Sequence, residues 1–331
     1  MRSQGRGRAA RWVAALAAWL MIGAAAPAWA ADQAFTITGT TVTDPAGLAT
    51  DATAGRYWVA NGGSGRLTVS ALNANGALFG TVHSSDQTTD LEGLAFHGNA
   101  LFIGDVGGDR SQVMLWRIYG PVPRTVIHQA DRYVLSYPDG RHRASAIFIT
   151  NDGRLHVVTR GRTATASGAI YAAPAAAIGT PGSALLQKVG DAPAGVTDAT
   201  VLADGRVALR TGTDVMTVDA SSYRVLQRDR VATQSTGGAL TPTIDGTKLL
   251  WGPEKVTSPV LAVDVPGGVQ ATPRASAAPT AEGTSAADAA QSVQRTVASV
   301  VSALSEGGNV LALLGAAAVA IVGAVVVLGK R

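Results

Sequence analysis

Short hydrophobic stretches alternate with turn residues along the middle of the chain, and five of these stretches resemble one another. Each begins at a Gly or Asn turn and continues as an apolar run that predicts a β-strand. The five lie at 55–61, 99–105, 153–159, 205–211 and 246–252. Their ends at 61, 105, 159, 211 and 252 are separated by 44, 54, 52 and 41 residues. Repeats of several strands at this spacing are typical of propeller blades.

Each repeated stretch is flanked by further apolar runs, so the pattern predicts at least three strands per repeat. Asp-Gly, which suits a tight hairpin, opens three of the five stretches. We therefore predict an all-β β-propeller over residues 31–266, with five or six blades. A sixth blade would combine 35–43 with 127–137 and close the ring with an N-terminal strand. The five blades are expected to begin near Pro45, Asp90, Arg143, Val196 and Gly237.

The N-terminal segment has the three-part pattern of a secretory signal. Four arginines precede an apolar core over 13–26, and Ala28-Trp29-Ala30 supplies a cleavage site between small residues. We predict a signal peptide over 1–30, so that the mature protein begins at Ala31. The alternative is an uncleaved membrane anchor, for which the apolar core is short.

The C-terminal segment predicts a tether and a membrane span. Residues 267–308 form an Ala/Pro/Ser-rich linker with a short amphipathic helix over 293–304, and 309–329 carry no charge over a length sufficient to cross a membrane. Lys330 and Arg331 follow, and positive residues are retained in the cytoplasm. The propeller is therefore expected outside the cell membrane, with the tip 330–331 in the cytoplasm. The alternative for 309–329, a buried core helix, has nothing nearby to bury it.

Charge and cysteine content narrow the function classes. The whole chain has a net charge of +4, but residues 32–264 contain 19 Lys and Arg against 20 Asp and Glu. The predicted propeller is thus nearly neutral, and we expect no nucleic-acid partner. The chain contains no cysteine, which excludes disulfides and thiolate metal sites.

Catalytic signatures are absent from the sequence. It has no Gly-x-Ser-x-Gly elbow, no His-Glu-x-x-His zinc helix and no phosphate-binding loop. The five histidines are far apart in the sequence, and His156, inside a predicted strand, is expected to be a packed or solvent-facing residue. A triad assembled in space is not supported by any pattern.

Acidic residues around the second repeat are the candidate chemistry. Asp90 and Glu92 precede its first strand, and Asp105 and Asp109 flank Gly107 after the next strand. Carboxylates beside glycine-rich backbone are suitable ligands for calcium, whereas the alternative is that Asp105 and Asp109 stabilise turns. A second candidate set on the axial face would form an anion-binding, ligand-binding group, or would form structural ion pairs. It comprises Arg110, Asp198 and Arg210.

The same residues carry a resemblance. Asp90-Leu-Glu-Gly-Leu-Ala95, Leu101-Phe-Ile-Gly-Asp-Val-Gly-Gly-Asp-Arg110 and Val113-Met-Leu-Trp-Arg117 resemble a family of exported actinobacterial β-propeller proteins, mostly uncharacterised. The similarity covers most of 45–265, and it implies the propeller fold and a location outside the cytoplasm. The family pattern has acids where this chain has Gly93, Gly108, Ser145 and Gly238. If those acids surround the propeller axis in relatives, their joint replacement indicates that this chain has lost a metal or cation site.

Three function classes follow. The first is a membrane-tethered, non-catalytic binding or scaffold module of the cell envelope, with an envelope protein or a small ligand as its partner. The second is a metal-dependent phytase-like or esterase-like hydrolase, in which the four carboxylates of the second repeat hold a metal that activates water. The third is a sensor, which is the weakest because only two residues follow the predicted span.

Overall fold

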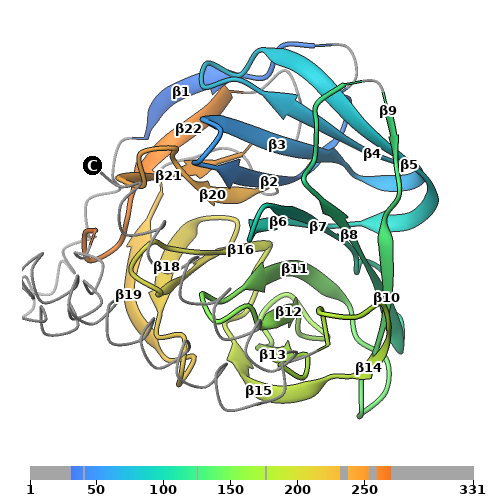
Figure 1. Ribbon diagram of the computed structural model, residues 1–331. Helices are drawn as coiled ribbons and strands as arrows, with labels where there is room; N and C mark the ends of the chain where they lie inside the picture. The colour runs from blue at the N-terminus through green and yellow to red at the C-terminus, as the bar shows by residue number, and fades with distance from the viewer. Residues whose placement is uncertain are drawn as a thin grey trace, which may run out of the picture. The chain divides into compact units, whose positions relative to one another are not determined.

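The computed structural model describes residues 31–39, 42–124, 126–175, 177–231, 238–252 and 259–269. In these residues the strands form five separate sheets arranged around one axis, so the protein is an all-β propeller with five blades (Figure 1). The predicted signal peptide and predicted span, and nearly all of the predicted linker, lie outside the described residues. No helix in the described part of the chain is long and apolar enough to cross a membrane.

Each blade is a sheet of antiparallel strands, and these strands follow one another outward from the axis. The innermost strands contact one another around the axis in the order β2, β6, β11, β16, β20 and back to β2. They are β2 (Pro45–Asp51), β6 (Gly93–His97), β11 (Ala144–Ile149), β16 (Asp198–Val201) and β20 (Leu240–Pro242). The blades that they begin are numbered 1 to 5 in that order.

The second strands are the five repeated stretches of the sequence. They are β3 (Arg56–Asn61), β7 (Ala100–Asp105), β12 (Leu155–Thr159), β17 (Val207–Arg210) and β21 (Lys248–Trp251). The third strands match the apolar runs that follow each repeat, which confirms the prediction of three strands per repeat. They are β4 (Gly63–Leu72), β8 (Gln112–Tyr119), β13 (Gly168–Ala172), β18 (Asp214–Val218) and β22 (Pro259–Asp264).

A fourth strand, which the sequence pattern did not predict inside the repeats, completes each blade. In the first four blades it is β5 (Leu78–Leu91), β10 (Asp131–Ser136), β15 (Gln187–Ala192) and β19 (Val225–Arg230). Two short strands, β9 (Val126–His128) and β14 (Gly182–Leu185), pair in parallel with β5 and β10 and widen blades 1 and 2.

The N-terminal strand β1 (Asp32–Thr36) closes the ring. It pairs antiparallel with β22 and thereby becomes the fourth strand of blade 5, beside which it lies in Figure 1. The predicted closure by an N-terminal strand is correct, but the sixth blade is wrong. Residue Phe35 belongs to blade 5, and most of the other proposed part, 127–137, forms the fourth strand of blade 2 as β10 and an added edge on blade 1 as β9.

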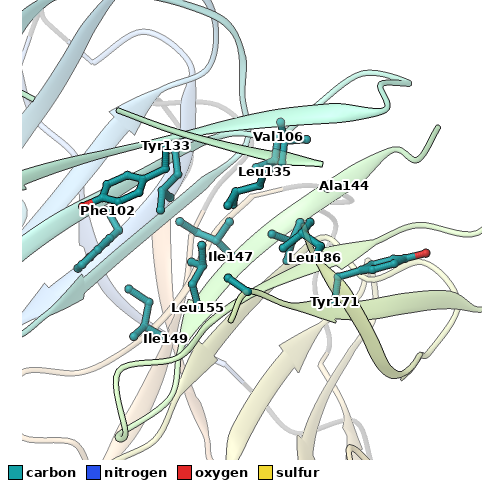
Figure 2. Packing of buried hydrophobic residues seen from close by; sticks show 14 of the residues in the cluster. Phe102, Val106, Tyr133, Leu135, Ala144, Ile147, Ile149, Leu155, Tyr171 and Leu186 are labelled. Atoms are coloured by element: carbon teal, nitrogen blue, oxygen red, sulfur yellow. The ribbon is translucent and has the colours of Figure 1, made fainter. Parts of the chain in front are cut away.

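The repeated second strands are hydrophobic at nearly every position because both faces of each blade are covered. Along β3, Trp58 and Ala60 pack between blades 1 and 2, whereas Tyr57 and Val59 pack between blades 5 and 1. Five such clusters separate the five pairs of neighbouring blades. Figure 2 shows the one between blades 2 and 3, where Phe102 and Tyr133 face Ile147 and Leu155. A sheet with two buried faces needs apolar residues at successive positions, which accounts for the repeat.

The turns from the innermost to the second strand use the predicted Asp-Gly pairs. Gly153, Gly205 and Gly246 have φ values of 80°, 89° and 70°. These angles lie in the left-handed region, which glycine adopts without steric cost. In the last turn the Thr243 hydroxyl donates to the Asp245 carboxylate at 2.5 Å, so the aspartate orders the hairpin.

His156 on β12 is a packed residue of the interface between blades 3 and 4. It is 1% exposed and stacks on Phe148 with ring centroids 4.5 Å apart. One ring nitrogen lies 3.0 Å from the Arg154 carbonyl oxygen and the other 2.8 Å from the Tyr223 hydroxyl. The carbonyl can only accept, so Nδ1 donates to it and Nε2 accepts from Tyr223, which describes a neutral imidazole. Burial lowers its pKa to about 4.

Ring closure gives a first prediction. Phe35 is buried between blades 5 and 1 and its ring lies 5.5 Å from that of Tyr57. Phe35→Ala is expected to lower the free energy of unfolding by about 3 kcal/mol, because it removes a buried aromatic side chain from the strand that closes the ring. Gln33→Ala, on an exposed position of the same strand, is the control. Equal urea midpoints for the two variants would show that β1 does not stabilise the ring.

His156 gives a second prediction. The unfolded chain takes up a proton near the ordinary histidine pKa of 6.5, whereas folded His156 does so only near 4. Stability is therefore expected to fall as the pH decreases from 6.5 to 4, by roughly 3 kcal/mol at most. Urea unfolding at successive pH values should show a smaller decrease for His156→Gln than for wild type. His128→Gln, at the outer strand β9, should retain the wild-type decrease, and a match between His156→Gln and wild type would contradict the assignment.

Candidate functional site

A polar pocket lies at the end of the axis where the innermost strands begin, and this end of the propeller is called the axial face. The pocket has a volume of about 510 Å³, and all five blades contribute to its lining. Blades 1 and 2 supply the carboxylates of Asp44, Asp90 and Glu92, and blade 3 supplies Arg160. The other lining residues are Pro45, Ala46, Gly62, Gly63, Leu91, Thr197 and Gly238.

Glu92 is an acid of this pocket whose pKa lies above its ordinary value. Burial raises its pKa, and the neighbouring carboxylates of Asp90 and Asp44 reinforce the increase. Arg160 and Arg143 oppose it by favouring the charged form. The pocket therefore combines a partly desolvated acid, two further acids and the guanidinium group of Arg160, a mixture that favours binding of a charged or polar ligand.

Asp105, a predicted calcium ligand, is instead part of the framework of blade 2. Its side chain is buried at the end of β7, and its two oxygens accept hydrogen bonds from the backbone N–H groups of Thr89 and Asp90, both at 2.8 Å. Arg110 donates to the same carboxylate at 2.6 Å. The three contacts fasten the connection from blade 1 to the second strand of blade 2, so these oxygens are already committed.

Arg110 completes this framework contact from the β7–β8 turn. Besides the Asp105 carboxylate, its guanidinium contacts two backbone groups. It donates to the carbonyl oxygens of Gly107 at 2.7 Å and of Asp105 at 2.9 Å. Its backbone forms two hydrogen bonds with that of His142, in the loop before β11. Arg110 was predicted to bind a ligand together with Asp198 and Arg210, but these hydrogen-bond partners all lie in blade 2 and in this loop.

Asp198 and Arg210 lie opposite each other on β16 and β17 and connect blade 4 to blade 5. The Asp198 carboxylate accepts from the N–H groups of Leu240 at 2.5 Å and Ala199 at 2.8 Å. Burial raises its pKa, and these N–H groups together with Arg210 oppose that increase. This places Asp198 in an inter-blade contact on the innermost strands.

Arg210 has no exposed surface. It donates to the carbonyl oxygens of Ala239 and Gly252, at 2.8 and 2.7 Å, and lies 3.9 Å from the centre of the Trp251 ring. The sequence left a ligand-binding group and a structural contact as alternatives for Arg210 and Asp198. Their burial and partners favour the structural role.

The four predicted metal ligands are not brought together. Asp90 and Glu92 line the axial pocket, Asp105 is committed as described, and Asp109 lies at the exposed rim with its carboxylate 3.4 Å from Arg141. In the described ranges, no group of three or more His, Asp and Glu side chains is arranged to hold a metal ion. A calcium site would therefore have to be built from Asp90 and Glu92 with other oxygen donors of the pocket.

The four positions where the resembling family carries acids lie around the axial face. Gly93 begins β6, Ser145 is the second residue of β11, and Gly238 lines the axial pocket. The Ser145 hydroxyl donates to the Val196 carbonyl oxygen at 2.8 Å and thus connects blades 3 and 4. A Cβ atom at Gly108 would lie 3.6 Å from the Asp90 carboxylate. Carboxylates at these positions would add negative charge close to the axial pocket.

Sequence reasoning missed a second, larger cleft beside the axial pocket. Its volume is about 840 Å³, and Arg160 lines both spaces. Four arginines line it, and they occur in the sequence as two Arg-x-Arg pairs, one before β11 and one after β12. This repeated pair was the signal available in the sequence, because the two segments flank neighbouring strands of one blade. The four are Arg141, Arg143, Arg160 and Arg162.

The opposite end of the axis has a smaller opening of about 300 Å³, again lined by all five blades. Its lining is dominated by aliphatic residues and by the Thr and Asp side chains of the hairpin turns. Thr50 and Thr241 bring the innermost strands of blades 1 and 5 together there, with their hydroxyl oxygens 2.9 Å apart. The lining of this opening contains no basic residue, whereas arginines line the spaces at the axial face.

Comparison with known proteins adds information on the fold only. No family model and no curated protein matches the chain. Similar solved structures include a gluconolactonase from Xanthomonas campestris, at 13% identity and a TM-score of 0.40, covering 73% of this chain and 99% of that one. A streptogramin B lyase matches at 10% identity and a TM-score of 0.39, covering 70% of this chain and 72% of that one. Both neighbours are β-propeller proteins.

A nidogen/laminin complex also matches, at 10% identity and a TM-score of 0.42, covering 62% of this chain and 70% of that one. All three TM-scores are below 0.5, so the five-bladed arrangement rests on the strand order given above. No match supports the resemblance to an exported actinobacterial family, which stays a prediction.

The different surroundings of Asp105 and Asp109 give a third prediction. Asp105→Ala is expected to lower the free energy of unfolding by about 3 kcal/mol, because it leaves Arg110 and two backbone N–H groups without their buried acceptor. Asp109→Ala removes an exposed carboxylate and should change stability by about 0.5 kcal/mol or less. Urea unfolding in the presence of chelator measures the free energy of unfolding of both variants. Similar small effects for the two variants would rule out the framework role of Asp105.

Proposed function

We propose that this protein is a non-catalytic binding module of the cell envelope, which presents the axial face of its propeller to a partner. The observation that carries the proposal is the axial pocket, an open polar space of about 510 Å³ to which every blade contributes. Its charged side chains are positioned by the starts of the innermost strands, which the ring holds rigidly. A preorganised, charged concavity of this kind is a typical ligand site.

The described lining of the pocket supports binding more than catalysis. It contains no histidine and no serine, so it lacks the usual nucleophile and general base of acyl transfer. Of the carboxylates proposed to activate water through a metal, Asp105 is occupied by framework contacts and Asp109 pairs with Arg141 at the rim. The acids that remain in the pocket are Asp44, Asp90 and Glu92.

One observation favours the hydrolase as a second candidate. A glutamic acid whose pKa is raised, in a pocket beside arginines, has the properties of a general acid. In a phytase-like or esterase-like enzyme, Glu92 would protonate the leaving group and Arg160 would stabilise developing negative charge. The two candidates therefore use the same pocket and differ in whether the ligand is altered.

The tether is the part of the proposal that comes from the sequence. A signal peptide at 1–30, a linker at 267–308 and a span at 309–329 would anchor the propeller to the cell membrane, with its ligand face outside. The first linker residues leave the propeller at blade 4, where Arg206 donates to the carbonyl oxygens of Pro266 and Gly268 at 3.3 and 2.6 Å. Such a tether suits display of the ring to envelope components.

Binding without conversion is the fourth prediction. The full-length chain, in mild detergent, should bind saturably to one or more of a defined panel of envelope polysaccharides, peptidoglycan and immobilised envelope proteins. Binding should survive chelator, and the ligand should be recovered unchanged. Asp44→Asn with Glu92→Gln should weaken binding at least about tenfold, because each neutral amide forms a weaker hydrogen bond than the carboxylate that it replaces. Asp191→Asn with Asp264→Asn, on outer strands, is the charge-matched control.

The hydrolase makes the opposite prediction. Turnover of phosphate or carboxyl esters by wild type, abolished by Glu92→Gln alone, would replace the binding module with an enzyme. Calcium titration by calorimetry, with thermal unfolding in parallel, separates the metal-dependent form of that enzyme. Tight stoichiometric calcium binding with a raised melting temperature, together with turnover that chelator abolishes, would contradict the proposal.

A further inference from the structure

The cleft beside the axial pocket is a concentration of positive charge on an otherwise nearly neutral propeller. It lies between loops of blades 2, 3 and 4, has a volume of about 840 Å³, and shares Arg160 with the axial pocket. The four arginines are accompanied by two carboxylates and one histidine. The full lining is Asp109, Asp139, Arg141, His142, Arg143, Arg160, Gly161, Arg162, Thr163, Ala164 and Gly195.

The two carboxylates of the cleft are already engaged. Asp109 pairs with Arg141. Asp139 accepts hydrogen bonds from the Tyr171 hydroxyl at 2.7 Å and from His142 Nε2 at 2.9 Å. Asp109 therefore neutralises one of the four arginines, Arg141, and the carboxylates of the cleft do not pair with the other three.

Arg143, Arg160 and Arg162 make no ion pair with any residue that the structure describes. Arg160 Nε is also buried without a hydrogen-bond partner among those residues. Glu92 is electrostatically coupled to Arg160 and Arg143 but does not lie within ion-pair distance of either. Three guanidinium groups with one partial counter-charge repel one another, and that repulsion is relieved when an anion binds.

The backbone that carries these arginines is fixed on both sides. His142 forms two backbone hydrogen bonds with Arg110 of blade 2, at 3.0 and 2.9 Å. Arg160 N–H donates to the Arg143 carbonyl oxygen at 2.7 Å, which places the two arginines on adjacent chain segments. The ring of His142 is further held between those of Tyr137 and Tyr171, with centroids 4.8 and 5.1 Å away. The cleft is thus preorganised before any ligand arrives.

We propose that this cleft binds a multivalent oxyanion, a ligand that carries several phosphate or carboxylate groups along its length. The planar guanidinium fork pairs with both groups through two parallel hydrogen bonds. The cleft volume of about 840 Å³ is far larger than one such group needs. Three uncompensated arginines in this space match several linked anionic groups better than a single small ion.

The inference rests on the proposed binding function and gives the chemistry of its ligand. A chain that lies in the cleft would reach the axial pocket at Arg160, which borders both spaces. The anionic groups would occupy the arginine-lined part, whereas the acids Asp44, Asp90 and Glu92 would accept hydrogen bonds from hydroxyl or amide groups of the same ligand and exclude further negative charge from the axial part. The axial face would thereby discriminate ligands by where along their length the anionic groups lie, as well as by their net charge.

The fifth prediction tests the cleft by calorimetric titration of the full-length chain with three probes. These are tripolyphosphate, a short poly-glutamate and orthophosphate, with a neutral oligosaccharide as the negative control. Tripolyphosphate, poly-glutamate or both should bind with an affinity that decreases with salt, and more tightly than orthophosphate. Arg143→Gln with Arg162→Gln should weaken the binding at least about tenfold.

Matched variants separate this site from general charge effects. Arg143 and Arg162 are exposed, so the double variant should retain the wild-type melting temperature. Arg143→Lys with Arg162→Lys should bind with intermediate affinity, because it keeps the charge and loses the planar fork. Arg228→Gln with Arg224→Gln, at exposed positions at and before β19, should bind like wild type.

The outcomes divide as follows. Binding of tripolyphosphate alone would assign the site to phosphate groups, and binding of poly-glutamate alone to carboxylates. No binding of either, or equal binding by the double glutamine variant, would overturn the inference. If envelope binding persists in that case, the proposed function stands without an anionic ligand. If the anions bind as expected but no envelope ligand is found, the cleft assignment stands and the binding-module proposal fails.

Discussion

Packing between blades is the constraint on which the rest of this structure depends. Each sheet is covered on both faces by its neighbours, so no blade can bury its hydrophobic surface alone. The ring is complete only when β1 joins β22, since that pairing places Phe35 against Tyr57 of blade 1. The starts of the five innermost strands are positioned by this closure, and the axial pocket is formed from those starts. The geometry of the candidate site is therefore a property of the whole ring.

Charged residues divide between framework and surface according to burial. Asp105 with Arg110, and Asp198 with Arg210, satisfy backbone groups where one blade or connection meets the next. Removing any one would leave a buried polar group without a partner, which explains why these residues look like a functional set in the sequence. The residues available to a ligand are those at the strand starts and loops of the axial face.

The sequence predicted the repeat but only part of the site. Second strands were recognisable because both of their faces are buried, as in β3, where four successive residues are buried. Outer strands such as β19 are largely exposed, so the sequence of Val225–Arg230 has two apolar residues followed by four polar ones and shows no strand-like apolar pattern. The blade count stayed open for a related reason, since the pairing of β1 with β22 is a contact between the two ends of the ring and has no local pattern.

The candidate site shows the same limit. Glu92 and Asp90 were identified because they precede a predicted strand, and both line the axial pocket. Asp105 lies only a short turn from Arg110, but its buried bonds to Thr89 and Asp90 depend on tertiary structure. The arginine cleft was missed because its four arginines lie in two segments that the strands β11 and β12 separate in the sequence. The antiparallel pairing of those two strands in blade 3 brings the two Arg-x-Arg pairs together into one positive surface.

Gly93 and Gly108, two positions at which the sequence resemblance predicts acids in related proteins, lie beside the axial pocket. An acid at Gly108 would approach the Asp90 carboxylate, and such a pair needs a cation to offset its repulsion. An acid at Gly93 would displace Ile147, because a Cβ atom there would already lie 3.0 Å from that buried side chain. With glycine at both positions the axial pocket keeps fewer negative charges, and Arg160 and Arg143 have less to neutralise them. Glycine at these two positions therefore adds no carboxylate beside the arginine cleft, so the positive potential of that cleft is preserved.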